Sequence, residues 1–487
     1  MNLTLDRPDL LRTQALIDGT WVDADDGSTR SVTNPATGDE LGAIANCGSA
    51  ETRRAIEAAE RALPAWRDTP VGERSTILRR WRDLLMAHQE DLARLMTAEQ
   101  GKPLAESRGE IAYGASYLEW FAEEAKRMYG EVIPPPANDR RVVCIRQGVG
   151  VVACITPWNF PNAMLARKIA PALAAGCTVV CKPANETPLS ALAMAALGEE
   201  AGVPAGVVNV LGGKTREIGA EMTSNPIVRK LTFTGSTEVG KLLVEQCAAT
   251  LKRTSMELGG NAPFIVFDDA DLDAAVEGAM ICKYRNAGQT CVCANRFLVQ
   301  DGIFDAFAER LAEKVRGLTS GDGMNEDTDV GPLITTEAAD DVLALVEQAT
   351  DAGARALVGG GRGKAGAHFV QPTVLVDVDD TMDVFRQEIF GPVAPLLRFT
   401  TEEEAVRMAN DTPFGLASYF YSRDIGRVWR VAEALEYGIV GINEGIISNA
   451  AAPFGGVKES GQGREGSRHG LDDYTEIKYL CMGGIER

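Results

Sequence analysis

Apolar and polar positions along the chain predict a helical segment followed by two α/β series. Apolar residues recur at helical spacing between residues 51 and 129, as in Ser75–Leu95 and Tyr113–Met128. Short apolar runs then alternate with helical patterns. The predicted strands are Val149–Ile155, Thr178–Cys181, Val207–Leu211 and Leu231–Phe233, and the helices between them are Ala163–Ala175, Ser190–Ala201 and Thr215–Thr223. This order predicts a doubly wound parallel sheet, an architecture that binds nucleotides at its strand ends.

The second α/β series begins near Asn261 and continues past Phe414. Gly359–Gly366 is typical of a flexible surface loop. The C-terminal segment Ile477–Met482 is apolar and strand-like. An edge strand needs a partner, so we expect it to pair with Arg141–Ile145 or across subunits. The predicted helices of this series are Asp271–Tyr284, Ile303–Leu318 and Glu402–Ala409.

These patterns predict two α/β domains and a small β element, because 487 residues exceed one ordinary core. Residues 1–130 and 148–259 are expected to form a Rossmann-type dinucleotide-binding domain. Residues 260–460 are expected to form an α/β catalytic domain. Residues 131–147 and 472–487 are expected to be oligomerisation strands, which favours a homo-oligomer, either a dimer or a tetramer.

Charge and composition narrow the class of partner. A net charge of −20 and a pI near 4.8 argue against nucleic acid or an anionic membrane as the main partner. The segment Met1–Asp18 lacks a continuous apolar stretch, and no run approaches the length of a membrane span. Ten scattered cysteines favour a reducing cytoplasm over a disulfide framework. Only three histidines occur, in unrelated contexts, so we expect no metal site.

Cys291 is the candidate nucleophile, because it lies between turn-forming residues and an apolar run in Asn286–Arg296. A free thiol has a pKa of ~8.5, so the site must hold or generate the thiolate. Most of the other cysteines are expected to pack as small hydrophobic residues. Cys293 lies two residues further on, and a strained Cys291–Cys293 disulfide is a minor hypothesis for a redox switch.

Two further motifs provide the groups that a thiolate would need. Asn159 follows a predicted strand in Thr156–Pro161, and its neutral amide could hold an alkoxide. Its alternative role is to satisfy a loop turn. Glu257 interrupts an apolar strand end in Met256–Gly260, where burial would raise its pKa toward that of a useful base. Most glutamates are instead solvated surface charges.

A third group of motifs suggests a nucleotide site. Phe233–Gly240 runs from a predicted strand into a helix, whose free N–H groups can bind pyrophosphate, although it departs from the GxGxxG fingerprint. Lys182 follows another strand, and Glu388 and Phe390 lie in a short loop motif. Taken alone, Lys182 could be a snorkelling side chain and Glu388 a surface charge.

In this order the motifs resemble the aldehyde dehydrogenase superfamily over nearly the whole chain. The resemblance implies that fold, with Cys291 as nucleophile, Asn159 and the Cys291 N–H as oxyanion donors, and Glu257 as the base that activates water. The cofactor-binding residues that it implies are Thr156, Pro157, Trp158, Lys182, Asn185, Gly235, Ser236, Leu258, Glu388 and Phe390.

The residue three places after Lys182 bears on the choice of cofactor. Members that prefer NAD commonly place a glutamate there, whereas this chain has Asn185. The carboxylate that would repel a 2′-phosphate is therefore absent at that position, although the adjacent Glu186 could bend in. We expect NADP, with NAD as a usable second cofactor.

The chain also resembles the branch of the superfamily that oxidises succinate semialdehyde to succinate in 4-aminobutyrate breakdown. This resemblance lies in three stretches, namely Asn159–Lys168, Lys283–Cys293 and Gly441–Ser448. Arginine binds a carboxylate through two parallel hydrogen bonds, so Arg167 and Arg285 are informative. The resemblance implies that these arginines and the Ser448 hydroxyl bind the distal carboxylate of the aldehyde. Structural ion pairs are their alternative role.

Two other activities remain open. Glutarate semialdehyde, which is one methylene longer, is an alternative substrate because a flexible site discriminates such a difference by only ~1 to 3 kcal/mol. From another class, Cys291, Glu257 and Asn159 could serve a thioesterase that needs no cofactor. The Gly235 and Glu388 segments count against that activity.

Overall fold

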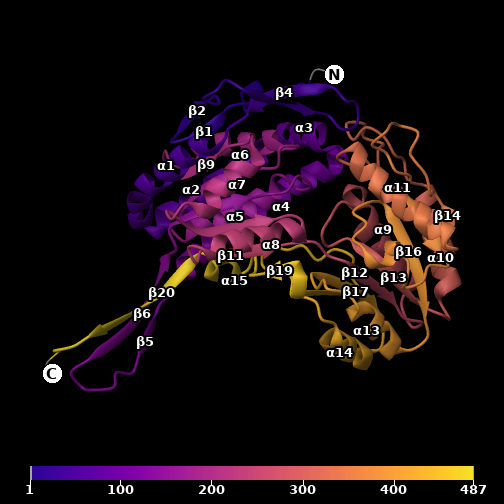
Figure 1. Cartoon of the computed structure of the whole chain (residues 1–487). Coiled ribbons are helices and arrows are strands. Elements are labelled where there is room, and N and C mark those ends of the chain that lie inside the picture. Colours follow the sequence, from indigo (N-terminus) through magenta and orange to yellow (C-terminus); the bar gives the residue numbers. More distant parts are fainter. Residues whose placement is uncertain (1–2, 486–487) are drawn as a thin grey trace.

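An eight-stranded sheet dominates the N-terminal half of the computed structural model, which describes residues 3–485 (Figure 1). Its five central strands are parallel, as the alternating pattern predicts. The edge strands β19, β1 and β2 run antiparallel to their neighbours. In spatial order the strands are β19 (Gly461–Gln462), β11 (Arg253–Glu257), β10 (Val228–Thr234), β7 (Val151–Ile155), β8 (Thr178–Lys182), β9 (Val208–Val210), β1 (Ala15–Ile17) and β2 (Thr20–Val22).

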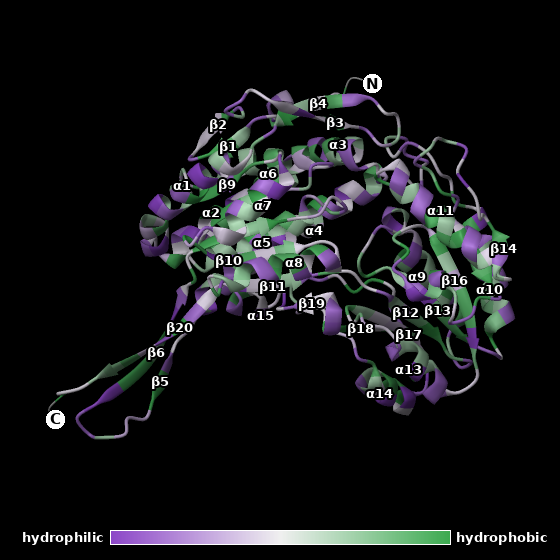
Figure 2. Ribbon diagram, viewed as in Figure 1, coloured by the Kyte–Doolittle hydropathy of each residue, from purple (hydrophilic) through white to green (hydrophobic). Residues whose placement is uncertain are grey.

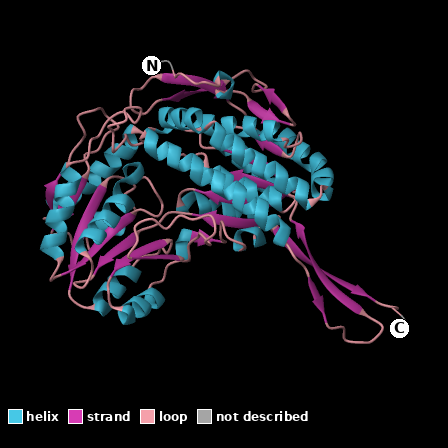
Figure 3. Cartoon of the chain, turned by 180° about the vertical axis from the view of Figure 1, so that it is seen from behind, coloured by secondary structure: helices cyan, strands magenta, loops and turns pink. Residues whose placement is uncertain are grey.

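Helices cover both faces of this sheet, and strand residues alternate between the two cores. Val152 and Cys154 point to one side, whereas Val151 and Ala153 point to the other. Figure 3 shows long helices packed side by side over the sheet. The first core takes in α2 (Val71–Ala87), α3 (Gln89–Gln100), α4 (Leu104–Glu124), α5 (Ala163–Ala174) and α6 (Pro188–Ala201), and the second α1 (Ser49–Asp68), α7 (Thr215–Ser224) and α8 (Thr237–Ala248).

Two predicted helices have different limits in the structure. The predicted helix Ser75–Leu95 is two helices, because His88 leaves the helical conformation at φ −111° and ψ 24° and separates α2 from α3. The apolar spacing continues across this break, so periodicity did not reveal it. The predicted helix Tyr113–Met128 begins earlier, at Leu104, and its regular part ends at Glu124.

A second sheet of seven strands forms the other lobe (Figure 1). Gly359–Gly366 lies outside the regular elements and is largely exposed, as the sequence predicts. The strands are, in spatial order, β14 (Arg355–Val358), β15 (Thr373–Val376), β16 (Val393–Phe399), β13 (Ala294–Gln300), β12 (Ala262–Val266), β17 (Ala417–Tyr421) and β18 (Ile439–Ile442). The helices of this lobe are α9 (Leu272–Tyr284), α10 (Phe304–Arg316), α11 (Thr336–Asp351), α12 (Asp383–Arg386), α13 (Glu402–Asn410) and α14 (Ile425–Ala434).

A three-stranded arm extends away from both lobes (Figure 1). It consists of β5 (Glu131–Ile133), β6 (Arg141–Gly148) and β20 (Thr475–Met482), and α15 (His469–Asp472) precedes its last strand. β20 pairs antiparallel with β6 over its whole length, which confirms the expected pairing within one chain. Apolar residues colour parts of this arm in Figure 2, and Val132 and Ile477 are 83% and 65% exposed. The arm therefore presents apolar surface with no partner in a single chain.

A small hairpin, β3 (Thr29–Thr33) and β4 (Glu40–Ala45), packs near the N-terminus. Within residues 3–485, no helix combines the length and the apolar character that crossing a bilayer requires.

Candidate active site

Cys291 lies in a sharply turned loop between α9 and β13. Asn286, Ala287 and Gly288 all have positive φ, at 51°, 54° and 75°. Glycine alone adopts such angles at little cost, so the surrounding contacts must hold the first two residues in this conformation. The Gln289 side chain does so in part, because it donates to the Asn286 carbonyl at 3.1 Å and accepts from the Ile334 N–H at 2.9 Å.

The Cys291 side chain lines two separate cavities. One, of about 250 Å³, is bounded by the predicted cofactor residues together with Asn159 and Glu257. The other, of about 280 Å³, contains Arg167 and Arg285. The nucleophile thus forms part of the wall of both, and a group bound in either cavity can approach its sulfur.

Asn159 is 4% exposed and lies in the loop after β7. Its side-chain N–H₂ donates one hydrogen bond, at 3.0 Å, to the carbonyl of Gln289 in the Cys291 loop. An amide nitrogen carries two hydrogens, so a second donor remains. No carbonyl oxygen among residues 3–485 accepts a hydrogen bond from the Cys291 N–H. Both expected oxyanion donors therefore have capacity for a ligand.

Glu257 is the last residue of β11 and is 2% exposed. Neither of its carboxylate oxygens has a hydrogen-bond partner within the described part of the chain. Burial raises the pKa of Glu257 well above its ordinary value, and the nearby Glu465 carboxylate raises it further. A carboxylate whose pKa is raised is a stronger base than an ordinary glutamate, which suits a general base.

The protein around Cys291 disfavours the thiolate. Burial raises the pKa of the Cys291 thiol to about 12, while Arg167 opposes this shift and Glu388 adds to it. The resting sulfur is therefore a neutral thiol at neutral pH. Its proton must be released before the sulfur can attack.

Most of the predicted cofactor residues surround the first cavity, which lies at the ends of the parallel strands. Thr156, Lys182 and Asn185 do not line it, but they lie at the same sheet edge: the Thr156 N–H donates to the Lys182 carbonyl at 3.1 Å. The predicted cofactor residues that do line it are Pro157, Trp158, Gly235, Ser236, Leu258, Glu388 and Phe390.

The helix start beside this cavity is built for close approach. Ser236 caps α8 by accepting from the Val239 N–H at 3.4 Å. A Cβ at Gly240 would come within 2.4 Å of the Leu258 side chain, so glycine lets the first turn of α8 lie directly against that side chain. Because Gly235 and Ser236 line the cavity and α8 begins at Thr237, the free N–H groups of its first turn can bind an anion there.

Glu388 and Phe390 form the opposite wall. The Glu388 carboxylate accepts from the Gly260 N–H at 3.0 Å, and burial raises its pKa to about 7. Phe390 has a positive φ of 52°, and its ring meets Trp158 edge to face with centroids 5.6 Å apart. These contacts fix one wall of the cavity against the loop that contains Asn159.

Lys182 and Asn185 lie further along the sheet edge. Burial lowers the pKa of Lys182 to about 8, and the exposed Glu186 carboxylate opposes this shift. Asn185 does not point freely into solvent, because its amide donates to the Gly213 carbonyl at 2.9 Å and to the Thr215 hydroxyl at 3.0 Å. Asn185 thus joins the β8 loop to the start of α7.

Arg167, Arg285 and Ser448 all line the second cavity. The Arg285 guanidinium lies 5.5 Å from the Phe160 ring and has no carboxylate within 4.0 Å in the described chain. Arg167 is 1% exposed and forms an ion pair with Glu465, and its Nη2 has no partner within residues 3–485. Arg167 therefore has the structural ion pair that was its alternative role, and it also keeps one nitrogen without a partner.

Several residues of the site were not identified from the sequence. Glu465 binds Lys168 at 2.6 Å as well as Arg167, and these cations hold its pKa below the usual range although burial alone would raise it. Nothing in the local pattern around Glu465 distinguishes it from a surface acid. The second cavity is completed by side chains from distant segments, namely Glu106, Glu110, Tyr113, Phe160, Met164, Ile446 and Phe454.

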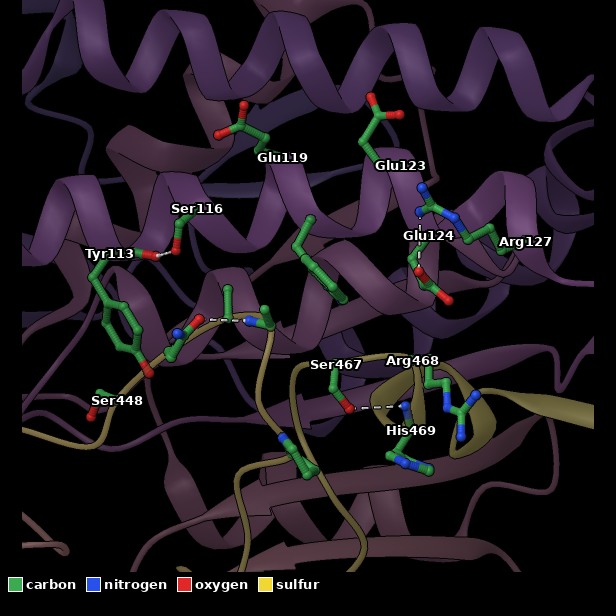
Figure 4. A pocket seen from close by; sticks show the side chains of 15 residues that line it. Tyr113, Ser116, Glu119, Glu123, Glu124, Arg127, Ser448, Ser467, Arg468 and His469 are labelled. Atoms are coloured by element: carbon green, nitrogen blue, oxygen red, sulfur yellow. Dashed lines mark hydrogen bonds and ion pairs between the residues drawn. The ribbon is translucent and has the colours of Figure 1, made fainter. Parts of the chain in front are cut away.

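A larger cavity of about 920 Å³ adjoins the second one along α4 (Figure 4). Tyr113 and Ser448 line both, and Figure 4 shows them together at one end. The charged residues Glu123, Arg127 and Arg468 lie toward the other end. The larger cavity and the second cavity therefore share a wall formed by Tyr113 and Ser448.

The predicted disulfide partner of Cys291 points elsewhere. Cys293 is buried, and its Sγ contacts the carbonyls of Lys283 and Ala294, each at 3.5 Å. All ten cysteines are free thiols. A Cys291–Cys293 disulfide stays a prediction, and forming it would require the Cys293 side chain to leave its buried position.

Comparison with known proteins agrees with this geometry. The aldehyde dehydrogenase family profile matches residues 21–480. The chain is 60% identical to the glutarate-semialdehyde dehydrogenase of Pseudomonas aeruginosa, covering 98% of this chain and 99% of the relative. It is also 60% identical to the succinate-semialdehyde dehydrogenase (NADP+) of Escherichia coli, covering 99% and 100%. The crystal structure of succinate-semialdehyde dehydrogenase from Burkholderia pseudomallei is 59% identical, with a TM-score of 0.98 over 99% of this chain and 100% of that one.

The chain belongs to the aldehyde dehydrogenase family, as its motifs suggest. It has the α/β fold of that family and is an aldehyde dehydrogenase.

Proposed function

We propose that this enzyme oxidises succinate semialdehyde to succinate with NADP, or less readily NAD, through a covalent adduct on Cys291. The observation that carries the proposal is the position of Cys291 in the wall shared by two cavities. One cavity offers two arginines to a carboxylated aldehyde. The other offers the strand ends and the start of α8 to a nucleotide.

The substrate assignment depends on the charge in the second cavity. Arg285 has no carboxylate partner of its own within 4.0 Å among residues 3–485, and Arg167 keeps one unpartnered nitrogen. Arg167 is buried and Arg285 is half-buried, and a guanidinium shielded from water without a full set of acceptors favours an anionic ligand. The Ser448 hydroxyl supplies a further donor from the loop after β18. A short aldehyde with a terminal carboxylate meets these requirements.

The residues of the first cavity fit a dinucleotide. The start of α8 can bind the pyrophosphate, Lys182 can bind a ribose, and Glu388 with Phe390 can bind the nicotinamide half. Asn185 replaces a carboxylate that would repel a 2′-phosphate, and the name of the Escherichia coli relative specifies NADP. When bound there, the nicotinamide supplies the hydride acceptor.

The chain's own residues perform the remaining steps. The Cys291 thiol releases its proton to water, and its sulfur bonds to the aldehyde carbon while the carbonyl electron pair moves to oxygen. Asn159 and the Cys291 N–H hold that oxyanion. After the hydride leaves, the carbonyl re-forms as a thioester. Water that has lost a proton to Glu257 attacks it, the C–S bond breaks, and the dicarboxylate departs.

Glutarate semialdehyde is the second candidate substrate. A relative with that name is as similar in sequence as the one named for succinate semialdehyde, each being 60% identical. Initial rates with aldehydes of two to six carbons, with and without a terminal carboxylate and with both nucleotides, test the assignment. Preference for an uncharged aldehyde would overturn it, and a higher kcat/KM for the longer substrate would replace succinate semialdehyde with glutarate semialdehyde.

The arm and the lobes support three smaller proposals. The eight-stranded sheet and its helices act as the dinucleotide-binding domain and the seven-stranded sheet as the catalytic domain.

The arm of β5, β6 and β20 joins subunits of a dimer or tetramer, because its exposed apolar side chains need a partner. The enzyme works in a reducing cytoplasm, which its ten free thiols favour. Native mass spectrometry of a Val132→Asp, Ile477→Asp variant tests the arm, and an unchanged oligomer would refute its role.

A further inference from the structure

The buried ion pair between Lys102 and Glu110 contacts the turn that contains Asn159. Lys102 Nζ donates to the Asn159 carbonyl at 2.7 Å and binds Glu110 at 2.5 Å. The other Glu110 oxygen accepts from the N–H groups of Asn162 and Ala163, at 2.9 and 3.1 Å. The pair therefore holds the turn between β7 and α5 at its middle and at its α5 end.

Both charges are fully removed from water. The side chains of Lys102 and Glu110 are 0% and 1% exposed, and Lys102 Nζ also lies 4.0 Å from the centroid of the Phe160 ring. Burying two charges is costly, and an apolar pair of similar size often stabilises a protein as well or better. Stability alone therefore does not account for an ion pair at this position.

A second set of contacts connects this turn to the nucleophile loop. Asn286 Nδ2 donates to the Asn159 carbonyl at 3.0 Å and to the Gln289 carbonyl at 3.2 Å. Gln100 donates to the Asn286 side-chain oxygen at 3.0 Å, and its own oxygen accepts from the Lys102 N–H at 2.9 Å. The segment from Gln100 to Lys102 thus orients both the Asn159 carbonyl and the loop that carries Cys291.

Glu99 is a buried glutamate that caps a helix, as Glu110 does, but without a lysine partner. Its carboxylate accepts from the N–H groups of Leu189 and Ser190, both at 2.8 Å, at the start of α6. Glu99 is 0% exposed, as a buried cap, and it forms no ion pair within the described chain. Glu110 does the same for α5, but Lys102 adds a bond to the Asn159 carbonyl. The difference between the two caps is a contact with the catalytic turn.

We propose that Lys102 and Glu110 are positioning residues that hold the Asn159 amide in line with the oxyanion formed at Cys291. The inference rests on the oxyanion role in the proposed function. A donor fixed before the reaction stabilises developing charge without reorganising, whereas a displacement of about 1 Å can cost on the order of a hundredfold in rate. The pair acts through Asn159: Glu110 borders the second cavity, but Lys102 and the N–H groups of Asn162 and Ala163 occupy its carboxylate oxygens.

A set of variants separates positioning from stability. The test protein is the double variant Lys102→Met, Glu110→Gln, which removes both charges and leaves neither unpaired. Glu99→Gln is the matched control, because it alters an equivalent buried cap whose hydrogen bonds go to the start of α6 and not to the Asn159 turn. Lys102→Met and Asn159→Ala are made alone, and each test variant is also combined with Asn159→Ala. Thermal unfolding accompanies every rate measurement.

We expect the double variant to lose on the order of 10- to 100-fold in kcat, with KM changed less than about threefold. The loss should be equal for succinate semialdehyde and butanal, and it should vanish in the Asn159→Ala background. Glu99→Gln should keep kcat within about twofold whatever its thermal midpoint. An undiminished loss in the Asn159→Ala background, or an equal loss in Glu99→Gln, would overturn the proposal.

Hydrolysis of p-nitrophenyl acetate provides a readout that needs neither aldehyde nor nucleotide. The ester acylates a thiol through an oxyanion at the same carbon position, with p-nitrophenolate as the leaving group. If the double variant slows this reaction while the wild type oxidises no semialdehyde, the positioning role stands and the substrate assignment fails. If the wild type oxidises the semialdehyde and the double variant matches it in both reactions, the positioning role fails alone.

Discussion

The Arg167 guanidinium forms a buried ion pair with Glu465, and the two side chains are 1% and 3% exposed. One arginine of the substrate cavity therefore already has a carboxylate partner. Arg285, in the same cavity, has none within 4.0 Å in the described chain. The two arginines should respond differently to substitution, because one has a structural partner and the other does not.

Arg285→Ala should raise the KM for succinate semialdehyde on the order of 10- to 100-fold, because a hydrogen bond to a charged group is worth about 1.5–3 kcal/mol. The KM for butanal, which has no carboxylate, should stay within about threefold. Steady-state rates with both aldehydes measure this difference. Arg423→Ala, which removes an exposed arginine paired with Asp271, is the control. Equal rises for both aldehydes would remove Arg285 from carboxylate binding.

Arg167→Ala should weaken succinate semialdehyde binding and also destabilise the fold. Breaking a buried ion pair costs up to about 3–5 kcal/mol, and here Lys168 remains as a partner of Glu465. Adding Glu465→Gln together with Lys168→Met, which leaves no charge of this cluster unpaired, should restore much of the thermal stability but leave KM high. Denaturation curves and KM values of the single and triple variants test this. A triple variant that recovers both properties would assign Arg167 a purely structural role.

Glu257→Gln should allow one turnover per site and then stop at the acyl-enzyme, which appears as a burst of reduced nicotinamide. In the wild type the pKa of Glu257 lies well above its ordinary value, so the base form is present at high pH and lost as pH falls through that pKa. Turnover should therefore rise with pH. Rapid-quench mass spectrometry detects the acyl group, and a Glu257→Gln variant with the full steady-state rate would refute this role.

Cys291 should react slowly with iodoacetamide at neutral pH and faster as pH rises. Burial raises its pKa to about 12, and only the thiolate is alkylated. Below that pKa the rate should increase about tenfold per pH unit in the nucleotide-free enzyme. Mass spectrometry follows the labelling, and the exposed Cys481 provides an internal comparison. A rate that reaches its plateau below pH 8 would show that the thiolate is held in the resting enzyme.

Asn185→Glu should shift cofactor preference toward NAD. A carboxylate there would repel a 2′-phosphate, so the ratio of kcat/KM for NADP to that for NAD should fall at least about tenfold. Asn185→Gln, which adds length without charge, is the matched control. If both variants lower the ratio equally, the lost hydrogen bonds to Gly213 and Thr215 are responsible and the charge is not.

The sequence predicted the parallel sheet and the general locations of its helices because hydrophobic periodicity is a local property. Break points were harder to predict. The apolar spacing runs unchanged through His88, where the backbone leaves the helix so that α2 and α3 can pack separately. The spacing of apolar residues therefore does not show where the helix axis changes direction.

The chain by itself indicated Cys291, Asn159, Glu257 and the family to which they belong, because each lies in a short motif beside a strand or turn. Only the folded structure disclosed the Glu465 partner of Arg167, the raised pKa of Cys291 and the Lys102–Glu110 pair beneath the Asn159 turn. Their effects depend on burial and on contacts between residues far apart in the chain. Local composition contains no information on either of these.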